Sequence, residues 1–168
     1  MKDEFFDVVG DKDNVTGRTT RKEAHSKGII HRSVMFFIVD RRGRVLVNHR
    51  TADKEFYPEY WSIALGGHVQ SGESYEQAVA REAKEEAGID AKPMFLAYFR
   101  KRFDKKDREN TRVYAFKNGS MPILDHREIK HGMFLYQKEL EQKMKEEKFL
   151  PETEKLYDIL KNKSAFLI

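Results

Sequence analysis

Short apolar runs alternate with polar, turn-forming stretches along this chain, a pattern typical of strands joined by turns. The strongest run covers residues 33–39, and its sequence SVMFFIV predicts a buried strand. Residues 40–43 form a predicted turn, and residues 45–47 are the expected hairpin partner of that strand. Further strands are predicted over residues 5–9, 15–16, 60–65, 94–102, 111–116 and 132–136.

A helical pattern is clearest over residues 74–87. Ser74 is placed to cap this helix, with Gln77 three residues later, and Gly88 to end it. A helical turn is also expected over residues 20–26, and two C-terminal helices over residues 137–148 and 152–161. Mixed strands, one central helix, more strands and terminal helices favour a layered α/β sandwich over a doubly wound fold.

Composition narrows the class of protein. The chain has 168 residues, near the roughly 150 of an average domain, so one domain over residues 1–168 is expected, with a helical extension over about 137–161. Hydrophobic residues make up 39% and charged residues 36%, which excludes a disordered chain. The net charge of +4 weakly favours anionic partners. Cysteine is absent, which excludes disulfides, thiolate metal sites and a cysteine nucleophile.

The sequence predicts neither a membrane segment nor an export signal. The longest apolar run, residues 34–39, has six residues, whereas a membrane helix needs about 20. The first residues are too acidic for a signal peptide. We therefore expect a cytoplasmic protein with no membrane partner.

One dense motif covers 23 residues. It reads Gly-His-Val-Gln-Ser-Gly-Glu over residues 67–73, then seven residues, then Arg-Glu-Ala-Lys-Glu-Glu-Ala-Gly-Ile over residues 81–89. Glu82, Glu85 and Glu86 are spaced i, i+3 and i+4, so they crowd one face of the predicted helix. Like charges side by side destabilise a helix, and Mg²⁺ or Mn²⁺ held by the carboxylate oxygens would compensate.

The rest of the predicted helix is suited to packing. Small residues on its opposite side are expected to face a sheet, namely Val79, Ala80, Ala83 and Ala87. An ion pair between Glu73 and Arg81 would pin the loop that enters the helix. The alternative interpretation is a solvated acidic face, which is what most glutamate clusters are. Agreement at nine fixed positions within 23 residues argues against that alternative.

The motif resembles the Nudix box, G-x5-E-x7-R-E-U-x-E-E-x-G-U, with Ala83 and Ile89 at the aliphatic positions U. The resemblance implies an α/β/α sandwich with a mixed sheet. It also implies hydrolysis of a diphosphate linkage in a small, nucleotide-derived substrate, with Mg²⁺ or Mn²⁺ as cofactor. The implied metal ligands are Glu82, Glu85, Glu86 and the backbone carbonyl of Gly67. The implied structural residues of the motif are Glu73, Arg81 and Gly88.

Hydrolysis also needs a carboxylate that orients or deprotonates the attacking water. Many Nudix enzymes take it from a loop, and Glu109, after a charged loop, is the candidate here. Glu82 or Glu86 is the alternative catalytic base. For Glu109 alone, a plain surface residue is the simpler interpretation, and Glu128 carries the same ambiguity.

A second resemblance lies upstream, to isopentenyl-diphosphate isomerase, an enzyme with a Nudix fold, and to the hydrolases most similar to it. It rests on His31, on Arg50 and Lys54, and on residues 56–61 and 66–73. It implies that Arg50 and Lys54 bind the substrate diphosphate and that His31 and His68 help to hold a metal. The alternatives are solvated loop cations and, for each lone histidine, a structural role.

Three departures argue against isomerase chemistry. The isomerase cysteine would fall at Gly66, and this chain has no cysteine. The isomerase breaks the Arg-Glu string that is intact at residues 81–82. Of its two later glutamates, Glu109 matches the first but Thr111 stands at the second. An isomerase-type enzyme and a non-catalytic module that binds a nucleotide or RNA remain the alternatives to a hydrolase.

Three further features stay open. Residues 100–108 hold six basic residues in nine, which is more often a solvated hairpin tip than an RNA contact, so nucleic acid is not expected as a partner. Phe56, Tyr57 and Trp61 either stack on a base, pack in the core or cover the cleft. The apolar residues 165–168 dock on the body or on a second subunit, which leaves a monomer or a homodimer.

Overall fold

A mixed seven-stranded sheet forms the centre of the computed structural model, which describes residues 4–54, 56–102, 105–118 and 121–163. Its strands are β3 (His31–Asp40), β4 (Val45–Arg50), β5 (Trp61–Ser62), β6 (Leu65–His68), β7 (Met94–Arg102), β8 (Arg108–Asn118) and β9 (Ile129–Leu135). The main path runs β5-β4-β3-β8-β7, while β6 pairs with β3 and β9 pairs with β4. Strands β3 and β8 are parallel and the other pairs are antiparallel, so the sheet is mixed.

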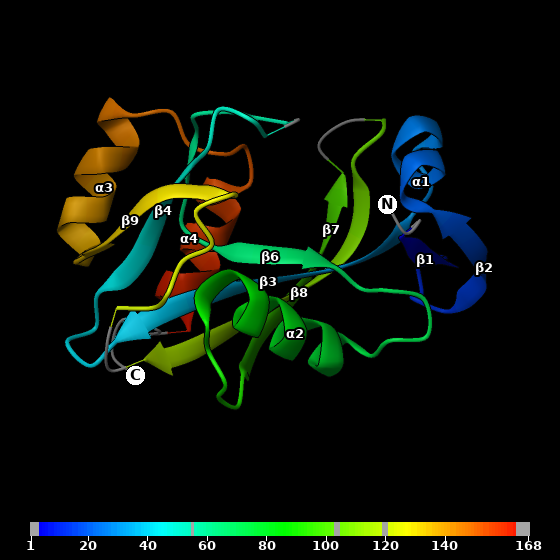
Figure 1. Cartoon of the computed structure of the whole chain (residues 1–168), viewed down its shortest axis with the longest axis horizontal. Coiled ribbons are helices and arrows are strands. Elements are labelled where there is room, and N and C mark those ends of the chain that lie inside the picture. Colours follow the sequence, from blue (N-terminus) through cyan, green and yellow to red (C-terminus); the bar gives the residue numbers. More distant parts are fainter. Residues whose placement is uncertain (1–3, 55, 103–104, 119–120, 164–168) are drawn as a thin grey trace.

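The strands β3 and β4 stop pairing and diverge soon after the turn that connects them. Only Val39 and Val45 pair between them, after which β3 pairs with β6 and β4 pairs with β9. The expectation of a regular hairpin between residues 33–39 and 45–47 is therefore wrong beyond its first pair. The divergence separates β6 from β4 in Figure 1, and the functional cleft described below lies there.

The predicted single strand over residues 60–65 is two short strands. The segment pairs first with β4, through Trp61 and Ser62, and then crosses to pair with β3 through β6. At the crossing, the side-chain amide of Asn48 donates to the carbonyls of Ser62 and Ala64 at 3.3 and 3.2 Å. These bonds satisfy backbone groups that leave the sheet ladder at the crossing.

Helix α2 (Tyr75–Ala87) covers one face of the sheet. Ser74 and Gln77 form the expected capping box, and Gly88 ends the helix at φ 63°, where the lack of a side chain avoids strain. Ala83 and Ala87 pack in the core with Val34 and Phe36 of β3. Ala80 is exposed, contrary to expectation, because its position in the helical period points outward and Ala78 takes the buried place.

Two C-terminal helices, α3 (Gln137–Glu146) and α4 (Thr153–Asn162), pack on the other face. Leu140, Leu156 and Leu160 are fully buried there. The chain between them is tied to β5, since Trp61 donates to Lys148 at 2.8 Å and accepts from Leu150 at 3.0 Å through backbone groups. The fold is therefore the expected α/β/α sandwich with a mixed sheet and C-terminal helices.

A smaller unit sits at one end of the sandwich. Strands β1 (Phe5–Val9) and β2 (Val15–Thr20) form a two-stranded antiparallel sheet, followed by α1 (Arg21–Lys27), on the right of Figure 1. Thr20 caps α1 and Gly28 ends it. Within the described residues, no helix is long and apolar enough to cross a membrane. The apolar residues 165–168 lie outside the described residues.

Candidate functional site

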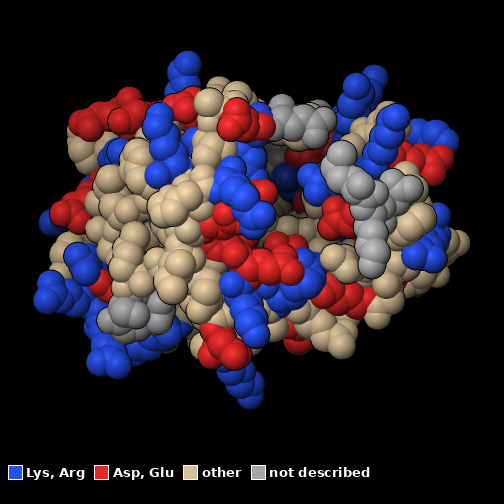
Figure 2. All heavy atoms as spheres, viewed as in Figure 1, with Lys and Arg blue, Asp and Glu red and all other residues tan. Residues whose placement is uncertain are grey.

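A cleft of about 750 Å³ lies where β3 and β4 diverge. Its walls come from β4 and the loop after it, from β6 and α2, from β7 and β8, and from residues 150–152 before α4. Figure 2 shows a hollow on this face of the molecule, with acidic side chains gathered beside it over α2. The dense sequence motif and the upstream residues of the second resemblance therefore meet in one place.

The three motif glutamates of α2 line this cleft together. Glu82 is 9% exposed, Glu86 is half-buried and Glu85 is exposed. The backbone N–H of Gly66 donates to Oε2 of Glu86 at 3.1 Å. At Gly67 a Cβ atom would overlap the carboxylate of Glu82, so the glycine lets that carboxylate lie directly against the backbone of β6. The glycines thus let β6 approach the acidic face of α2 closely.

Burial gives these carboxylates unusual acidities. It raises the pKa of Glu82, and it raises the pKa of Glu86 to about 8, with further contributions from the charges of Glu82 and Glu128. Two neighbouring carboxylates that resist ionisation form a site that a divalent cation would stabilise. An all-oxygen donor set of this kind suits Mg²⁺ or Mn²⁺.

Arg81 organises the loop and the acidic face at once. Its guanidinium donates to both oxygens of Glu73 at 3.0 Å, to the carbonyl of His68 at 3.0 Å and to Glu82 at 2.6 Å. Glu73 also accepts from the backbone N–H of Gln70 at 2.9 Å. The ion pair expected between Glu73 and Arg81 is therefore present, and it fixes the loop before α2 against the strand β6.

The two cations expected to bind phosphate line the opposite wall of the cleft. Arg50 donates to the carbonyls of Phe56 and Tyr57 at 2.8 and 3.1 Å, and burial lowers its pKa. Lys54 forms an ion pair with Glu128. Both cations face the cleft, but each also holds a neighbouring loop in this structure.

A histidine cluster occupies the end of the cleft nearest α1. His25, His31 and His68 place one ring nitrogen each within 4.8 Å of one another. Burial and the neighbouring histidines lower the pKa of His25 to about 4, and burial lowers the pKa of His31. In the described part of the chain, Nε2 of His25 and Nε2 of His31 are buried without a hydrogen-bond partner. Imidazole nitrogens that converge in this way suit a transition metal better than Mg²⁺.

Glu109 belongs to this histidine cluster. It is 5% exposed on β8, so its interpretation as a plain surface residue is wrong. Its Oε1 lies 3.6 Å from Nε2 of His68, 3.7 Å from Nζ of Lys101 and 3.9 Å from Nε2 of His31. Burial alone would raise the pKa of Glu109, but Lys101 and His68 hold it well below its usual range.

Sequence reasoning missed two residues of the cleft. His25 joins the cluster because α1 carries it over the end of β3, and no local pattern signals that contact. Glu152 is 6% exposed at the cleft and begins α4 without a side-chain capping bond. Its charge acts on Arg50 and Lys101. A buried, charged residue before a surface helix has no signature in the sequence alone.

The aromatic residues and the basic segment singled out in the sequence take different places in the structure. Trp61 is 5% exposed in the core, whereas Phe56 and Tyr57 are 55% and 39% exposed and line the cleft. The basic segment is tied down by contacts within the chain: Arg100 donates to Asp11 and Lys101 pairs with Asp107 at 3.0 Å. Residues 103–104 of that segment lie outside the described residues.

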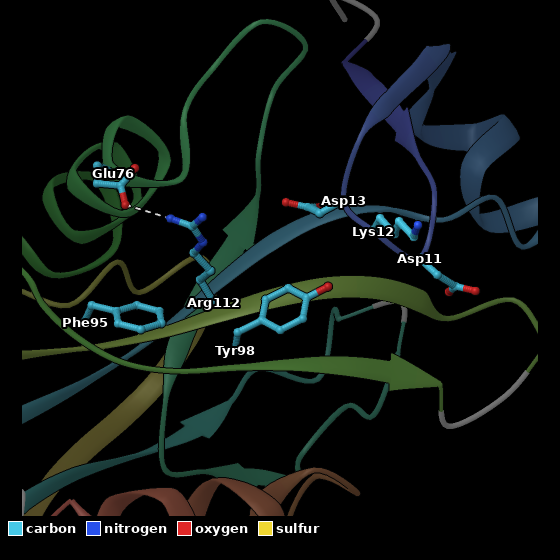
Figure 3. Close-up of a pocket in the computed structure, with 7 residues that line it drawn as sticks. All are labelled: Asp11, Lys12, Asp13, Glu76, Phe95, Tyr98 and Arg112. Carbon is cyan, nitrogen blue, oxygen red and sulfur yellow. Dashed lines mark hydrogen bonds and ion pairs between the residues drawn. The ribbon is translucent and has the colours of Figure 1, made fainter.

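A second hollow, of about 550 Å³, lies away from the cleft (Figure 3). It is lined by Asp11, Lys12, Asp13, Glu76, Phe95, Tyr98 and Arg112. Arg112 donates to Glu76 at 3.0 Å, and Asp13 accepts from Tyr75 at 3.0 Å and pairs with Arg32 at 3.1 Å. These contacts pair Glu76, Arg112 and Asp13 within the protein.

Comparisons with known proteins agree on one family. A model of the NUDIX domain matches residues 29–155. A Nudix hydrolase of Streptomyces coelicolor is 34% identical over 152 residues, which is 89% of this chain and 84% of that protein. An isopentenyl-diphosphate Delta-isomerase of Photorhabdus laumondii is 30% identical over 142 residues, covering 80% of this chain and 81% of that protein.

A solved structure resembles the whole chain. The crystal structure of DR0079 from Deinococcus radiodurans superposes with a TM-score of 0.79 and 26% identity. The match covers 95% of this chain and 98% of that chain. The small β1-β2-α1 unit and the C-terminal helices therefore belong to a known arrangement of this fold.

Proposed function

This chain belongs to the Nudix hydrolase family, whose enzymes act on phosphorus-containing anhydrides, and from that premise we propose that it cleaves a diphosphate linkage in a small, nucleotide-derived substrate with Mg²⁺ or Mn²⁺ as cofactor. The observation that carries the proposal is the acidic face of α2, where Glu82, Glu85 and Glu86 meet the glycines of β6 in a cleft. We expect the protein to act in the cytoplasm on a free small molecule.

The proposed metal ligands are Glu82, Glu85, Glu86 and the backbone carbonyl of Gly67. A bound divalent cation would neutralise diphosphate charge, polarise phosphorus and lower the pKa of a bound water. The chain's own contribution is to hold the carboxylates in place before the cation arrives. Arg81 does this by donating to Glu82 and Glu73, and the bare backbone of Gly67 makes room for the carboxylate of Glu82.

Glu86 is the residue we propose as the base that takes a proton from the attacking water. Glu86 lines the cleft, and the backbone N–H of Gly66 fixes one of its carboxylate oxygens. Glu82 and Glu109 are the other candidates, but Arg81 bonds the carboxylate of Glu82. Lys101 and His68 hold the pKa of Glu109 well below its usual range, which makes Glu109 a weak base. We therefore assign Glu109 to the histidine cluster rather than to proton transfer.

Arg50 and Lys54 are proposed to bind the substrate phosphates. Each already makes protein contacts, Lys54 with Glu128 and Arg50 with loop carbonyls, so an incoming phosphate would share or exchange those partners. Arg50 offers a planar fork and Lys54 a point charge, which together suit a chain of phosphates. Lys101 is another cation that lines the cleft.

The isomerase alternative is weakened by two positions. A Cβ atom at Gly66 would overlap the carbonyl oxygen of Val34, so the backbone has no space for a cysteine side chain there. Thr111, at the second glutamate position, hydrogen-bonds Ser33 at 2.8 Å instead. The histidine cluster nevertheless offers nitrogen ligands for a second, transition-metal ion, as the resemblance implies for His31 and His68.

A phosphate-release screen coupled to a phosphatase, which frees phosphate from the phosphomonoester products, tests the proposed function. The panel includes nucleoside di- and triphosphates, nucleotide sugars, dinucleoside polyphosphates, NADH, coenzyme A and isopentenyl diphosphate, each with Mg²⁺, with Mn²⁺ and with a chelator. We expect turnover that the chelator abolishes. Glu86→Gln serves as the blank. Metal content of the purified protein is measured alongside, because it reports on the histidine cluster separately. Tight nucleotide or RNA binding without metal-dependent turnover would instead support a non-catalytic module.

A further inference from the structure

Two aromatic rings stand exposed at the mouth of the cleft. Phe56 is 55% exposed and Tyr57 is 39% exposed, and both line the cleft. Among the described residues of the cleft wall, they are the sources of phenyl and phenol rings. The phenyl ring of Phe56 lies near the histidine cluster, with its centroid 6.4 Å from that of His25. Aromatic side chains beside polar groups are the usual lining of small-molecule sites, so the position of these two rings in the cleft points to contact with a ligand.

The loop that presents these rings is held in an unfavourable shape. Tyr57 has φ 51° and Glu59 has φ 60°, values that non-glycine residues rarely adopt and that cost about 1 kcal/mol or more each. Such a conformation persists only where surrounding contacts impose it.

Three side chains hold the loop of Phe56 and Tyr57 in this conformation. Arg50 donates to the carbonyls of Phe56 and Tyr57, and the imidazole of His49 donates from Nε2 to the carbonyl of Glu59 at 2.9 Å. Lys130 pairs with the carboxylate of Glu59 at 3.1 Å. All three anchors come from β4 and β9, so the loop that carries the rings is bonded to the central sheet.

We propose that Phe56, supported by Tyr57, is the platform on which the base of a nucleotide substrate stacks. The proposal rests on the proposed function and adds the substrate class that this wall reads. Every nucleobase has a flat π-face, which a preorganised ring binds without a large loss of side-chain entropy. Arg50 is bonded to the backbone of the same loop, so a phosphate-binding cation and a base-binding ring are presented by one anchored unit.

The experiment measures binding, so it does not depend on turnover. Calorimetry gives the Kd of the four nucleoside monophosphates and of ribose 5-phosphate, which lacks a base, for each variant. Phe56→Leu keeps an apolar side chain but removes the flat ring, and Phe56→Trp keeps a ring. Phe95→Leu is the matched control, because Phe95 is also 55% exposed but lines the second hollow.

We expect Phe56→Leu to weaken binding of the preferred nucleotide about 5- to 100-fold and to leave ribose 5-phosphate binding unchanged. Phe56→Trp and Phe95→Leu should bind the nucleotide as the wild type does. Equal nucleotide affinity in Phe56→Leu overturns the proposal, and so does no nucleotide binding by the wild type. Equal weakening of both ligands overturns it as well, since Phe56 would then act through the loop and not on the base.

The outcome is separable from that of the hydrolase proposal. Base binding that depends on Phe56, without metal-dependent turnover of any panel member, would support the stacking role of Phe56 and contradict the proposed hydrolase function. Turnover of a nucleotide with no dependence on Phe56 would do the reverse.

Discussion

The cleft and the second hollow are alike in outline and different in chemistry. Both are concave, and both combine aromatic rings with acidic and basic side chains. In the hollow of Figure 3, Arg112 and Glu76 satisfy each other, and Asp13 is held by Arg32 and Tyr75. In the cleft, by contrast, some carboxylates and histidine nitrogens are buried with too few hydrogen-bond or ion-pair partners to compensate for the loss of water.

This shortage of partners is visible at two places in the cleft. Burial raises the pKa of Glu86 to about 8, and His25 buries a ring nitrogen that has no hydrogen-bond partner in the described structure. Desolvating a polar group costs free energy unless a partner compensates. The difference suggests that the missing partners of the cleft are ligands, whereas the hollow is complete as it stands.

The largest expected effect is on turnover. Glu85→Gln or Glu86→Gln should lower kcat about 10²- to 10⁴-fold with the fold retained, because each removes a charge from the cation site. Glu76→Gln, on the same helix but in the hollow, should keep kcat within about twofold. Circular dichroism and kcat with Mg²⁺ check the prediction. Full activity in both cleft variants would remove the distinction between the two regions.

A smaller effect is expected from the arginine that organises the cleft. Arg81→Lys keeps the charge but cannot reproduce a fork that bonds Glu73, Glu82 and the backbone of β6 together. Misplacement of the carboxylates should lower kcat/KM by about 10²-fold. Arg112→Lys in the hollow is the control and should be near wild type. A similar loss in both variants would show that Arg81 matters only for the fold.

The smallest effect concerns acid stability. Burial and neighbouring histidines lower the pKa of His25 to about 4. Between pH 6.5 and 4, His25 is therefore protonated in the unfolded chain but not in the folded protein. The free energy of unfolding of the metal-free protein should therefore fall as the pH drops through that window, by about 2 kcal/mol. Urea unfolding at pH 7.5 and pH 5 measures it. His25→Gln should reduce the slope and leave the part that the buried His31 contributes, whereas the exposed His126→Gln should leave the slope unchanged.

The sequence predicted those features of the molecule that depend on residues close together along the chain. Helix α2 follows from Ser74, Gln77 and Gly88, and the acidic face follows from the spacing of Glu82 and Glu86. The fold class followed from the order of elements together with the Nudix resemblance. Each of these depends on neighbours within a few turns of the chain, so periodicity and capping chemistry suffice to find them.

The rest depends on contacts between distant segments. The divergence of β3 from β4 results from competition by β6 and β9, which the short-range hairpin signal does not contain. The sequence singled out Glu109 as a candidate residue but did not predict its burial. Its burial results from packing against His31 and His68, which lie on two other strands. His25 and Glu152 were missed for the same reason.

Binding of Mg²⁺ tests the central claim most directly, because the nitrogen ligands of the histidine cluster bind this ion poorly. Calorimetry at pH 8 would compare the wild type with Glu85→Gln, Glu86→Gln and the hollow variant Glu76→Gln. The account predicts that the wild type and Glu76→Gln bind Mg²⁺ alike, and that the two cleft variants bind it at least about tenfold more weakly. Cleft variants that bind Mg²⁺ as tightly as the wild type would contradict the assignment of the α2 glutamates as the metal site.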